Sequence, residues 1–346
     1  MHRTSNWLKI SSSVVVVGFM ILLTAVMPVG AIEVRSTIAN VLMPMPITWD
    51  NSSFSGFYYD IDKNLGAETL TFRPTLTTPT GATLSDQPDA NNNRGVVYQT
   101  QAQLKTFKFK PWGQYDVIGF LGDLYFAAYD PTVTFGIVNA GETVALLYDV
   151  SKNRNLMTNE QISKILIDNK NETLFNSSSP LKLKEGYELF LKSINVNETK
   201  AVIELKKNGQ SVDTKIIQPS STTGDRTYYY TKDLGDTKGI VILAVNFKNV
   251  FHGADKDRAA IDGIFQISDT PTSLKSEQQY DKMSIRNVDA TGMTLTMDNK
   301  DNQVTLSKNK DIPLMGKIHL RTADQDGTAD APLRYYIYSE EPCSLE

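Results

Sequence analysis

The residues that could do chemistry in this sequence are few and widely spaced. Hydrolytic triads need a base, usually histidine, and His2 lies in the N-terminal segment, which leaves His252 and His319. His252 lies near Asp255 and Asp257 and could act as a metal ligand, whereas His319 alternates within a strand-like run. The sequence contains no Gly-x-Ser-x-Gly elbow, no His-Glu-x-x-His motif and no Gly-rich phosphate loop. Carboxylates for a glycosidase pair occur in any chain of this length. We therefore predict no enzymatic activity and no cofactor.

Acidic loops offer oxygen ligands for a hard cation. Asp324, Asp326 and Asp330 could hold a structural divalent cation in one loop, or could form a solvated turn. The segment 60–66 spaces its oxygen ligands as an EF-hand begins, but its glycine comes one position late. Thr71 stands where an EF-hand requires Glu. The segment 60–66 is therefore not an EF-hand, and the loop from Asp324 to Asp330 remains the candidate metal site.

The N-terminus has the order of a secretory signal peptide. Arg3 and Lys9 precede an apolar run, Val14 to Val26, and small residues lead to Ala31. The run is shorter than the roughly 20 apolar residues that span a bilayer. We expect cleavage after Ala31, so that residues 1–31 are a signal peptide and the rest of the chain is extracellular. An uncleaved run would instead serve as an N-terminal anchor.

Charge and cysteine content exclude several classes of protein. Because Arg3 and Lys9 leave with the signal, the net charge falls by two, from -4 to -6, which offers no evident attraction to nucleic acid or anionic lipid. No second apolar run of spanning length follows, so we predict no direct membrane span after signal removal. Cys343 is the single cysteine, which excludes an internal disulfide. Glu346 and export both argue against prenylation of that cysteine.

Four glycosylation sequons occur in the sequence. They begin at Asn51, Asn171, Asn176 and Asn197, and each has Ser or Thr two residues later. In an exported protein such sites mark surface positions that can carry sugar. Because three of them lie between Asn171 and Asn197, we expect one face to be glycosylated.

Short alternating runs between turn signals predict a mainly all-β fold. The clearest hairpin turns at Asn208-Gly209, since both central residues of a type I′ turn need positive φ. We expect Ile203 and Leu205 to face inward on one strand of this hairpin, and Val212 and Ile216 on the other.

Two further segments predict buried strands. Ile240 to Val245 is almost continuously apolar, which is typical of a central strand covered on both faces. Leu295 and Met297 alternate with threonines, and we expect Val304 and Leu306 to pair with them across a polar turn.

One stretch, near 159–168, favours a short helix. Thr158 can cap it, Gln161 can complete a capping box, and its apolar side chains repeat at helical spacing, at Ile162, Ile165 and Leu166. A single helix among many strands suggests two packed sheets rather than a doubly wound α/β sheet.

Polar breaks suggest how the strands are divided between domains. The segments 169–180 and 268–279 enclose a region with its own set of strands. We predict two linked β-sandwich subdomains, the first built from 32–175 plus 277–342. The second, at 176–276, would be inserted into the first, and two sandwiches in simple succession are the alternative.

A series of longer motifs covers most of the chain. They run in this order: Trp49, Phe54 to Leu70, Trp112-Gly-x-Tyr115, Ile118 to Gly122, Tyr125 to Ala127, Leu183 to Leu189, Lys232 to Gly235, Val250 to Asp269, Leu314 to Gly316 and Leu333 to Tyr336. This series resembles the surface-layer (S-layer) duplication domain of Methanosarcina-type archaeal S-layer proteins, from about Glu33 to Tyr338.

The resemblance implies a structural glycoprotein of the archaeal cell envelope. Members of that family pair linked β-sandwiches in a porous lattice, so the expected partners are other S-layer copies or paralogues. The family brings no catalytic residues to this chain. The family's major proteins carry two domain copies, a stalk and a membrane helix, whereas we find one copy here and expect a single-copy member. It would either form the lattice or associate with it.

A second function remains open. Tyrosines cluster at Tyr58-Tyr59, Tyr228 to Tyr230 and Tyr335 to Tyr338, and tyrosine is common in interfaces and sugar contacts. They could serve a secreted glycan- or protein-binding adhesion module without lattice assembly. We favour the simpler interpretation that alternate tyrosines fill the core and rim of a sheet.

Overall fold

The computed structural model describes residues 31–85, 95–132, 137–138, 142–144, 146–195, 197, 199–220, 223–253 and 255–342. Residues 1–30 of the predicted signal peptide and Cys343 therefore lie outside the described residues. Strands dominate, and all of the described ladders between strands are antiparallel except β12 with β19, which confirms the mainly β fold. The described helices are short: α1 (Leu147–Val150) and the 3-10 turns η1 (Lys110–Trp112) and η2 (Met157–Asn159).

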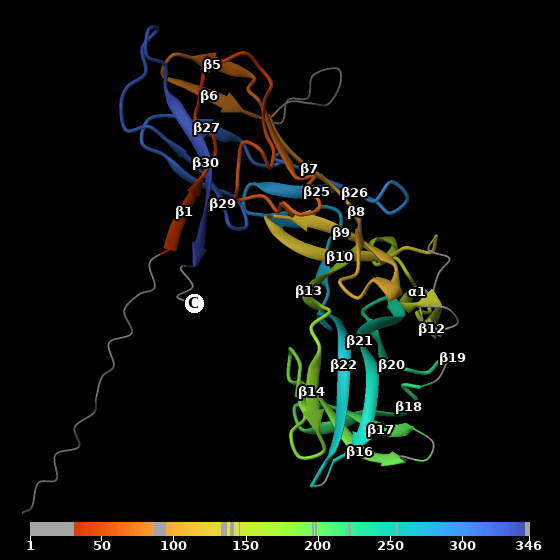
Figure 1. Cartoon of the computed structure of the whole chain (residues 1–346). Coiled ribbons are helices and arrows are strands. Elements are labelled where there is room, and N and C mark those ends of the chain that lie inside the picture. Colours follow the sequence, from red (N-terminus) through yellow and green to blue (C-terminus); the bar gives the residue numbers. More distant parts are fainter. Residues whose placement is uncertain are drawn as a thin grey trace, which may run out of the picture.

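Three sheets form the upper part of the molecule (Figure 1). The first is ordered β1-β30-β29-β28, with β2 also paired to β30: β1 (Ala31–Arg35), β2 (Ala39–Asn40), β28 (Asp311–Met315), β29 (Ile318–Thr322) and β30 (Arg334–Pro342). The second is ordered β24-β25-β26-β7-β4-β3: β3 (Ile47–Trp49), β4 (Thr69–Arg73), β7 (Gly95–Gln101), β24 (Gln279–Tyr280), β25 (Met283–Asp289) and β26 (Thr294–Asp298). The third is ordered β27-β6-β5: β5 (Leu76–Thr78), β6 (Gly81–Leu84) and β27 (Val304–Leu306).

A long sheet runs from the middle of the molecule into the lower part. It is ordered β20-β21-β22-β13-β10-β9-β8, with β14 on β22 and β23 on β13: β8 (Gln103–Thr106), β9 (Gln114–Phe120), β10 (Asp123–Tyr129), β13 (Gln161–Asn169), β14 (Thr173–Asn176), β20 (Thr227–Leu234), β21 (Thr237–His252), β22 (Asp257–Ile267) and β23 (Thr272–Ser273). Two smaller sheets complete the described strands: β15 (Leu181–Lys182), β16 (Tyr187–Asn195), β17 (Lys200–Lys207) and β18 (Gln210–Ile217) in one, β11 (Ile137–Val138), β12 (Glu142–Val144) and β19 (Thr223–Gly224) in the other.

Two hydrophobic clusters fill the molecule. We call the cluster around Trp49, Phe72 and Tyr335 the upper core, and the cluster around Trp112 and Phe265 the lower core. The lower core takes buried residues from 107–267 and the upper core takes residues from both ends of the described chain. Residues 107–175 thus contribute side chains to both clusters, while the predicted domain boundaries themselves stay a prediction.

The strands in the middle of the molecule are buried on both faces. On β9, Val117 packs in the lower core and the next residue, Ile118, in the upper core. On β10, Phe126 and Ala127 divide in the same way. Because successive side chains of a strand point to opposite faces, one pair of strands supplies a wall to each core.

A buried carboxylate fastens this shared hairpin to the upper core. Glu68 is fully buried and accepts hydrogen bonds from the main-chain amides of Tyr58 at 2.7 Å and Gly122 at 2.8 Å, and from the hydroxyl of Tyr98 at 2.8 Å. Gly119 faces this carboxylate, since a Cβ at that position would stand 2.8 Å from Glu68 Oε2. Burial raises the pKa of Glu68, and the three donors offset part of that effect.

The helix predicted near 159–168 is wrong, because this segment is the strand β13. The chain makes only the 3-10 turn η2, and Glu160 ends that turn in the left-handed region at φ 51°. Ile162 of β13 packs in the upper core, while Ile165 and Ile167 pack against the lower core. A bulge between Ile165 and Ile167 breaks the period of two, so burial on both faces imitates a helical spacing.

The predicted hairpin at Asn208-Gly209 is confirmed, but the inward direction of Val212 and Ile216 is wrong. Both turn residues have positive φ, 49° and 80°, as a type I′ turn requires. A bulge shifts the register after the turn, so that Asp213 instead of Val212 lies opposite Leu205. A shift of one residue exchanges the two faces of a strand, which leaves Ile216 66% exposed.

The predicted central strand is confirmed, whereas one predicted pairing is wrong. Ile240 to Val245 are buried within β21, which lies between β20 and β22. Val304 and Leu306 are buried too, but their strand pairs with β6 rather than with β26. The Asn299 side chain explains the change of sheet, because it donates to the carbonyl of Leu84 at 3.0 Å and accepts from the amide of Val96 at 2.8 Å.

We expect Glu68→Gln to lower the free energy of unfolding by about 1–3 kcal/mol, since an amide has one acceptor oxygen and leaves a buried donor unpaired. Urea denaturation of the purified protein measures the change. Glu172→Gln is the matched control, because Glu172 forms an exposed ion pair with Lys248 and should contribute less than about 1 kcal/mol. Equal losses in the two variants would contradict a special role for the buried carboxylate.

Candidate functional site

The acidic loop that the sequence favoured as a metal site is open and exposed. Asp324, Asp326 and Asp330 are all exposed, and Asp326 pairs with Lys308 at 3.2 Å. Within the residues that the structure describes, no three His, Cys, Asp or Glu side chains come together as a metal site. Cation binding by this loop stays a prediction.

The four sequons lie at two ends of the molecule. Asn51 follows β3 in a turn, whereas Asn171 and Asn176 flank β14 and Asn197 lies between β16 and β17. Asn171 and Asn197 are exposed, and Asn51 and Asn176 are half-buried. The Asn176 carboxamide oxygen accepts hydrogen bonds from two main-chain amides, those of Ser178 at 2.9 Å and Ser179 at 3.0 Å. Glycosylation of these positions stays a prediction.

The two histidines lie far apart in the sequence and in different sheets. His252 is exposed at the end of β21, and its Nδ1 forms a hydrogen bond with the Asp257 carboxylate. His319 lies on β29, with its ring 5.2 Å from that of Tyr338 and its Nδ1 3.7 Å from Asp311. Neither imidazole has a Ser, Thr or Cys nucleophile among these contacts. The described contacts of the two histidines therefore do not form a catalytic triad.

An ion-pair network covers the outer face of the β28-β29-β30-β1 sheet. The Arg321 guanidinium donates to Asp311 at 2.6 Å, and it also donates to Tyr338 at 2.8 Å and to Glu33 at 2.5 Å. The hydrogen bond to the Asp311 carboxylate, more than any other contact, raises the pKa of Arg321. Because these residues come from four different strands, the network fixes the sheet as one charged, rigid face.

The clustered tyrosines divide between the core and its half-buried rim, as the simpler interpretation predicted. Tyr228, Tyr335 and Tyr338 are buried, whereas Tyr59 is 41% exposed. The Tyr228 hydroxyl donates to Asp213 at 2.8 Å, which satisfies the polar tip of a buried ring. These clusters therefore carry packing, and they form no continuous exposed aromatic platform among the described residues.

Asp269 accepts hydrogen bonds from three side chains beside the lower core. Its Oδ2 accepts from Lys232 at 2.6 Å, from Tyr187 at 2.7 Å and from Lys207. Burial raises the pKa of Asp269, but these donors outweigh that effect and hold the pKa well below its ordinary value. Because Asp269 follows β22 and its partners lie on β16, β17 and β20, the cluster clamps both sheets to the segment that leads back to the upper part.

Two edge strands expose apolar side chains. β18 is the last strand of its sheet, and it presents Val212 and Ile216 to solvent. β5 is the last strand of the β27-β6-β5 sheet, and its Leu76 is 62% exposed. In Figure 1 the two strands lie toward opposite ends of the molecule. Natural proteins usually blunt free edges with charge or cover them, so uncovered apolar edges indicate contact surfaces.

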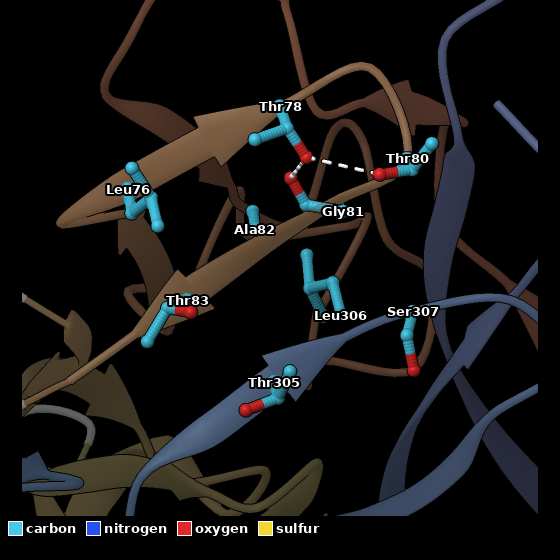
Figure 2. A pocket seen from close by; sticks show the side chains of 9 residues that line it. All are labelled: Leu76, Thr78, Thr80, Gly81, Ala82, Thr83, Thr305, Leu306 and Ser307. Carbon is cyan, nitrogen blue, oxygen red and sulfur yellow. Dashed lines mark hydrogen bonds between the residues drawn. The ribbon is translucent and has the colours of Figure 1, made fainter. Parts of the chain in front are cut away.

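A shallow groove of about 230 Å³ lies beside β5 (Figure 2). Leu76 borders it, and hydroxyl groups of Thr83, Thr305 and Ser307 line it. The Thr78 hydroxyl bonds to the carbonyl of Gly81 at 3.3 Å. The groove carries no charged side chain in its lining, and it offers hydrogen-bonding groups next to an exposed leucine.

The described surfaces thus combine two edges that expose apolar side chains with fixed charge clusters. The model of the family described as "S-layer protein" matches residues 39–324. The chain belongs to the S-layer protein family. S-layer proteins lie at the cell surface, and the expected cell-envelope, structural class is therefore confirmed.

Curated relatives cover most of this S-layer chain. It is 27% identical over 90% of its length to the "Major S-layer protein" of Methanosarcina mazei, and 28% identical over 92% to that of Methanosarcina acetivorans. The "Major S-layer protein" of Methanosarcina barkeri is 26% identical over 89%. The chain spans only 40%, 42% and 40% of the length of these relatives. Within the described residues, no helix combines the length and apolar composition that a membrane crossing requires.

Two buried carboxylates of this S-layer protein were missed from the sequence. Nothing in the spacing of Glu68 and Asp269 in the printed sequence distinguishes them from exposed acids. A weak signal existed for Glu68, because Gly119 and Gly122 interrupt the apolar run that faces it. Asp269 gave no such signal, since Lys207, Lys232 and Tyr187 come from distant segments.

We expect Asp269→Asn to lower the free energy of unfolding by about 1–3 kcal/mol near neutral pH, because Lys207 and Lys232 lose their shared counter-charge. The native pKa lies well below the reference value of 3.8, so the contribution is fully present above 3.8 and is lost progressively as the pH falls from there through the native pKa. Urea denaturation at about pH 7 and about pH 3 should therefore show the gap between the two proteins shrinking in acid. A gap that stays constant or widens in acid would contradict this assignment.

Proposed function

We propose that this S-layer protein is a structural subunit that forms, or docks onto, a porous lattice outside the cell. The observation that carries the proposal is the pair of uncovered apolar edges, β5 and β18, on a chain of the S-layer family. A repeating layer needs at least two distinct contact surfaces on each subunit. Edges toward opposite ends of the molecule meet that requirement with other S-layer copies or paralogues as partners.

Strand addition explains how such an edge would work. An edge strand presents unpaired main-chain groups that a neighbouring strand can complete, and flanking side chains then give specificity. On β18, the apolar side chains of Val212 and Ile216 lie on the outer face, and Lys215 turns inward to donate to the carbonyl of Tyr229. An approaching subunit would therefore meet apolar surface at this edge. An outward-pointing lysine at the same place would disfavour contact.

Export and glycosylation belong to the same proposal. A signal peptide at residues 1–31 would deliver the chain to the cell exterior, and sugar at Asn171, Asn176 and Asn197 would decorate one end. Mass spectrometry of peptides from the native protein tests this part: we expect an Ile32 N-terminus and a sugar on Asn197, which is exposed. Unmodified peptides at all four sequons would contradict glycosylation without affecting the lattice proposal.

Electron microscopy of the purified protein on a lipid monolayer tests assembly directly. We expect periodic arrays, formed alone or on a sheet of a longer S-layer protein. Particles that stay single on both supports would contradict the lattice function. Saturable binding of those single particles to glycans would then favour the adhesion module.

Ile216 gives a sharper test of the β18 edge. We expect Ile216→Lys to abolish the arrays or reduce their order, because an ammonium group would have to lose its hydration in the contact. Its effect on the free energy of unfolding should stay within about 0.5 kcal/mol, since the side chain is exposed. Ile216→Val is the matched control and should assemble as the unchanged protein does. Normal arrays from Ile216→Lys would exclude β18 as a contact.

A further inference from the structure

A row of oxygen-bearing side chains crosses three strands at one end of the shared sheet. Thr106 on β8 lies opposite Gln114 on β9. Asp130 directly follows β10, and its main-chain amide donates to the carbonyl of Gln114 at 3.4 Å, so Asp130 extends the same row. Asp116 lies opposite Ala128. Since side chains alternate along a strand, Gln114, Asp116 and Asp130 share one face of the sheet.

Asp130 is held in place with one oxygen bare. The residue is only 4% exposed, and its Oδ1 accepts hydrogen bonds from the main-chain amide of Thr132 at 2.8 Å and from the Thr132 hydroxyl at 2.7 Å. Its Oδ2 is buried and accepts no hydrogen bond from the described residues. A buried carboxylate oxygen without a partner is unfavourable, and such an atom is rare in folded proteins.

The second carboxylate makes this environment more negative. Burial, followed by the negative charge of Asp130, raises the pKa of Asp116 to about 6. Among the described residues, no lysine or arginine forms an ion pair with either carboxylate. Asp116 and Asp130 are diagonal neighbours on one face of β9 and β10, with the unsatisfied oxygen on Asp130, and a cation bound by both carboxylates would neutralise their charge.

We propose that Asp130 and Asp116, together with Gln114, bind a hard divalent cation, Ca²⁺ or Mg²⁺. Asp130 Oδ2 supplies the buried ligand, Asp116 the second carboxylate and Gln114 an amide oxygen. Hard cations take carboxylate, carbonyl and water oxygens, and Mg²⁺ commonly uses one or two carboxylates with several waters. This site is separate from the exposed loop at Asp324 to Asp330, and it does not depend on lattice formation.

Its position predicts an effect on the whole fold. The ligands come from β9 and from the end of β10, the two strands that supply walls to both cores. A cation that binds only the folded protein stabilises it in proportion to the logarithm of the free ion concentration, once that concentration exceeds the dissociation constant. Occupancy should therefore raise the melting temperature of the molecule as a unit.

The experiment is calorimetric titration of chelator-treated purified protein with CaCl₂ and, separately, with MgCl₂, together with thermal unfolding at each end point. We expect one equivalent of one of these ions to bind and to raise the melting temperature. Asp130→Asn and Asp116→Asn should weaken binding at least about tenfold and remove the thermal shift, since even outer partners of a metal contribute about that much. Asp324→Asn is the matched control and should leave both unchanged.

Three results would overturn the site. Failure of both ions to bind the unchanged protein would exclude the site. Undiminished binding by Asp130→Asn would exclude this site, and loss of binding in Asp324→Asn would place the cation in the exposed acidic loop. Should Asp130→Asn fail to fold, Gln114→Ala carries the test, with weakened binding expected and undiminished binding contradicting the site. Assembly on a monolayer is measured separately, so failure here leaves the lattice proposal standing.

Discussion

The shared sheet is the constraint on which the rest of the molecule depends. β9, β10 and β13 are covered on both faces, so the two cores cannot be separated without exposing apolar surface on each side. Two sandwiches joined by a linker would be free to rotate, because linkers fix neither distance nor angle. Here alternate side chains of the same strands belong to different cores, and the relative placement of the two parts follows from the period of a β-strand.

Buried charges act at the points where this arrangement has to be fixed. Glu68 accepts a hydrogen bond from Gly122 in the turn of the β9–β10 hairpin. Asp269 connects the strands around the lower core to the segment that returns to the upper part. Both carboxylates are satisfied by several donors, which is the condition under which buried charge is compatible with stability. They specify where chain segments meet, whereas the apolar clusters supply most of the favourable free energy.

The mainly β fold could be predicted from alternation and turn residues, and the Asn208-Gly209 turn could be placed to the residue. Two of the errors, in β13 and β18, have one physical origin, which is that bulges break the period on which such arguments rest. At Val212 one extra residue exchanged the faces of β18, and in β13 a bulge with burial on both faces imitated a helix. The acidic loop at Asp324 was visible because its residues are neighbours in sequence, whereas Asp116 and Asp130 meet only through strand register.

The long ladder between β21 and β22 has a mechanical consequence. Nine residue pairs join the two strands, which run along the lower part of the molecule in Figure 1. A pull applied along these strands loads their hydrogen bonds in shear, so that many must break together, whereas a pull across them would open one bond at a time. Tension carried from one end of the molecule to the other would meet the ladder in its strong direction.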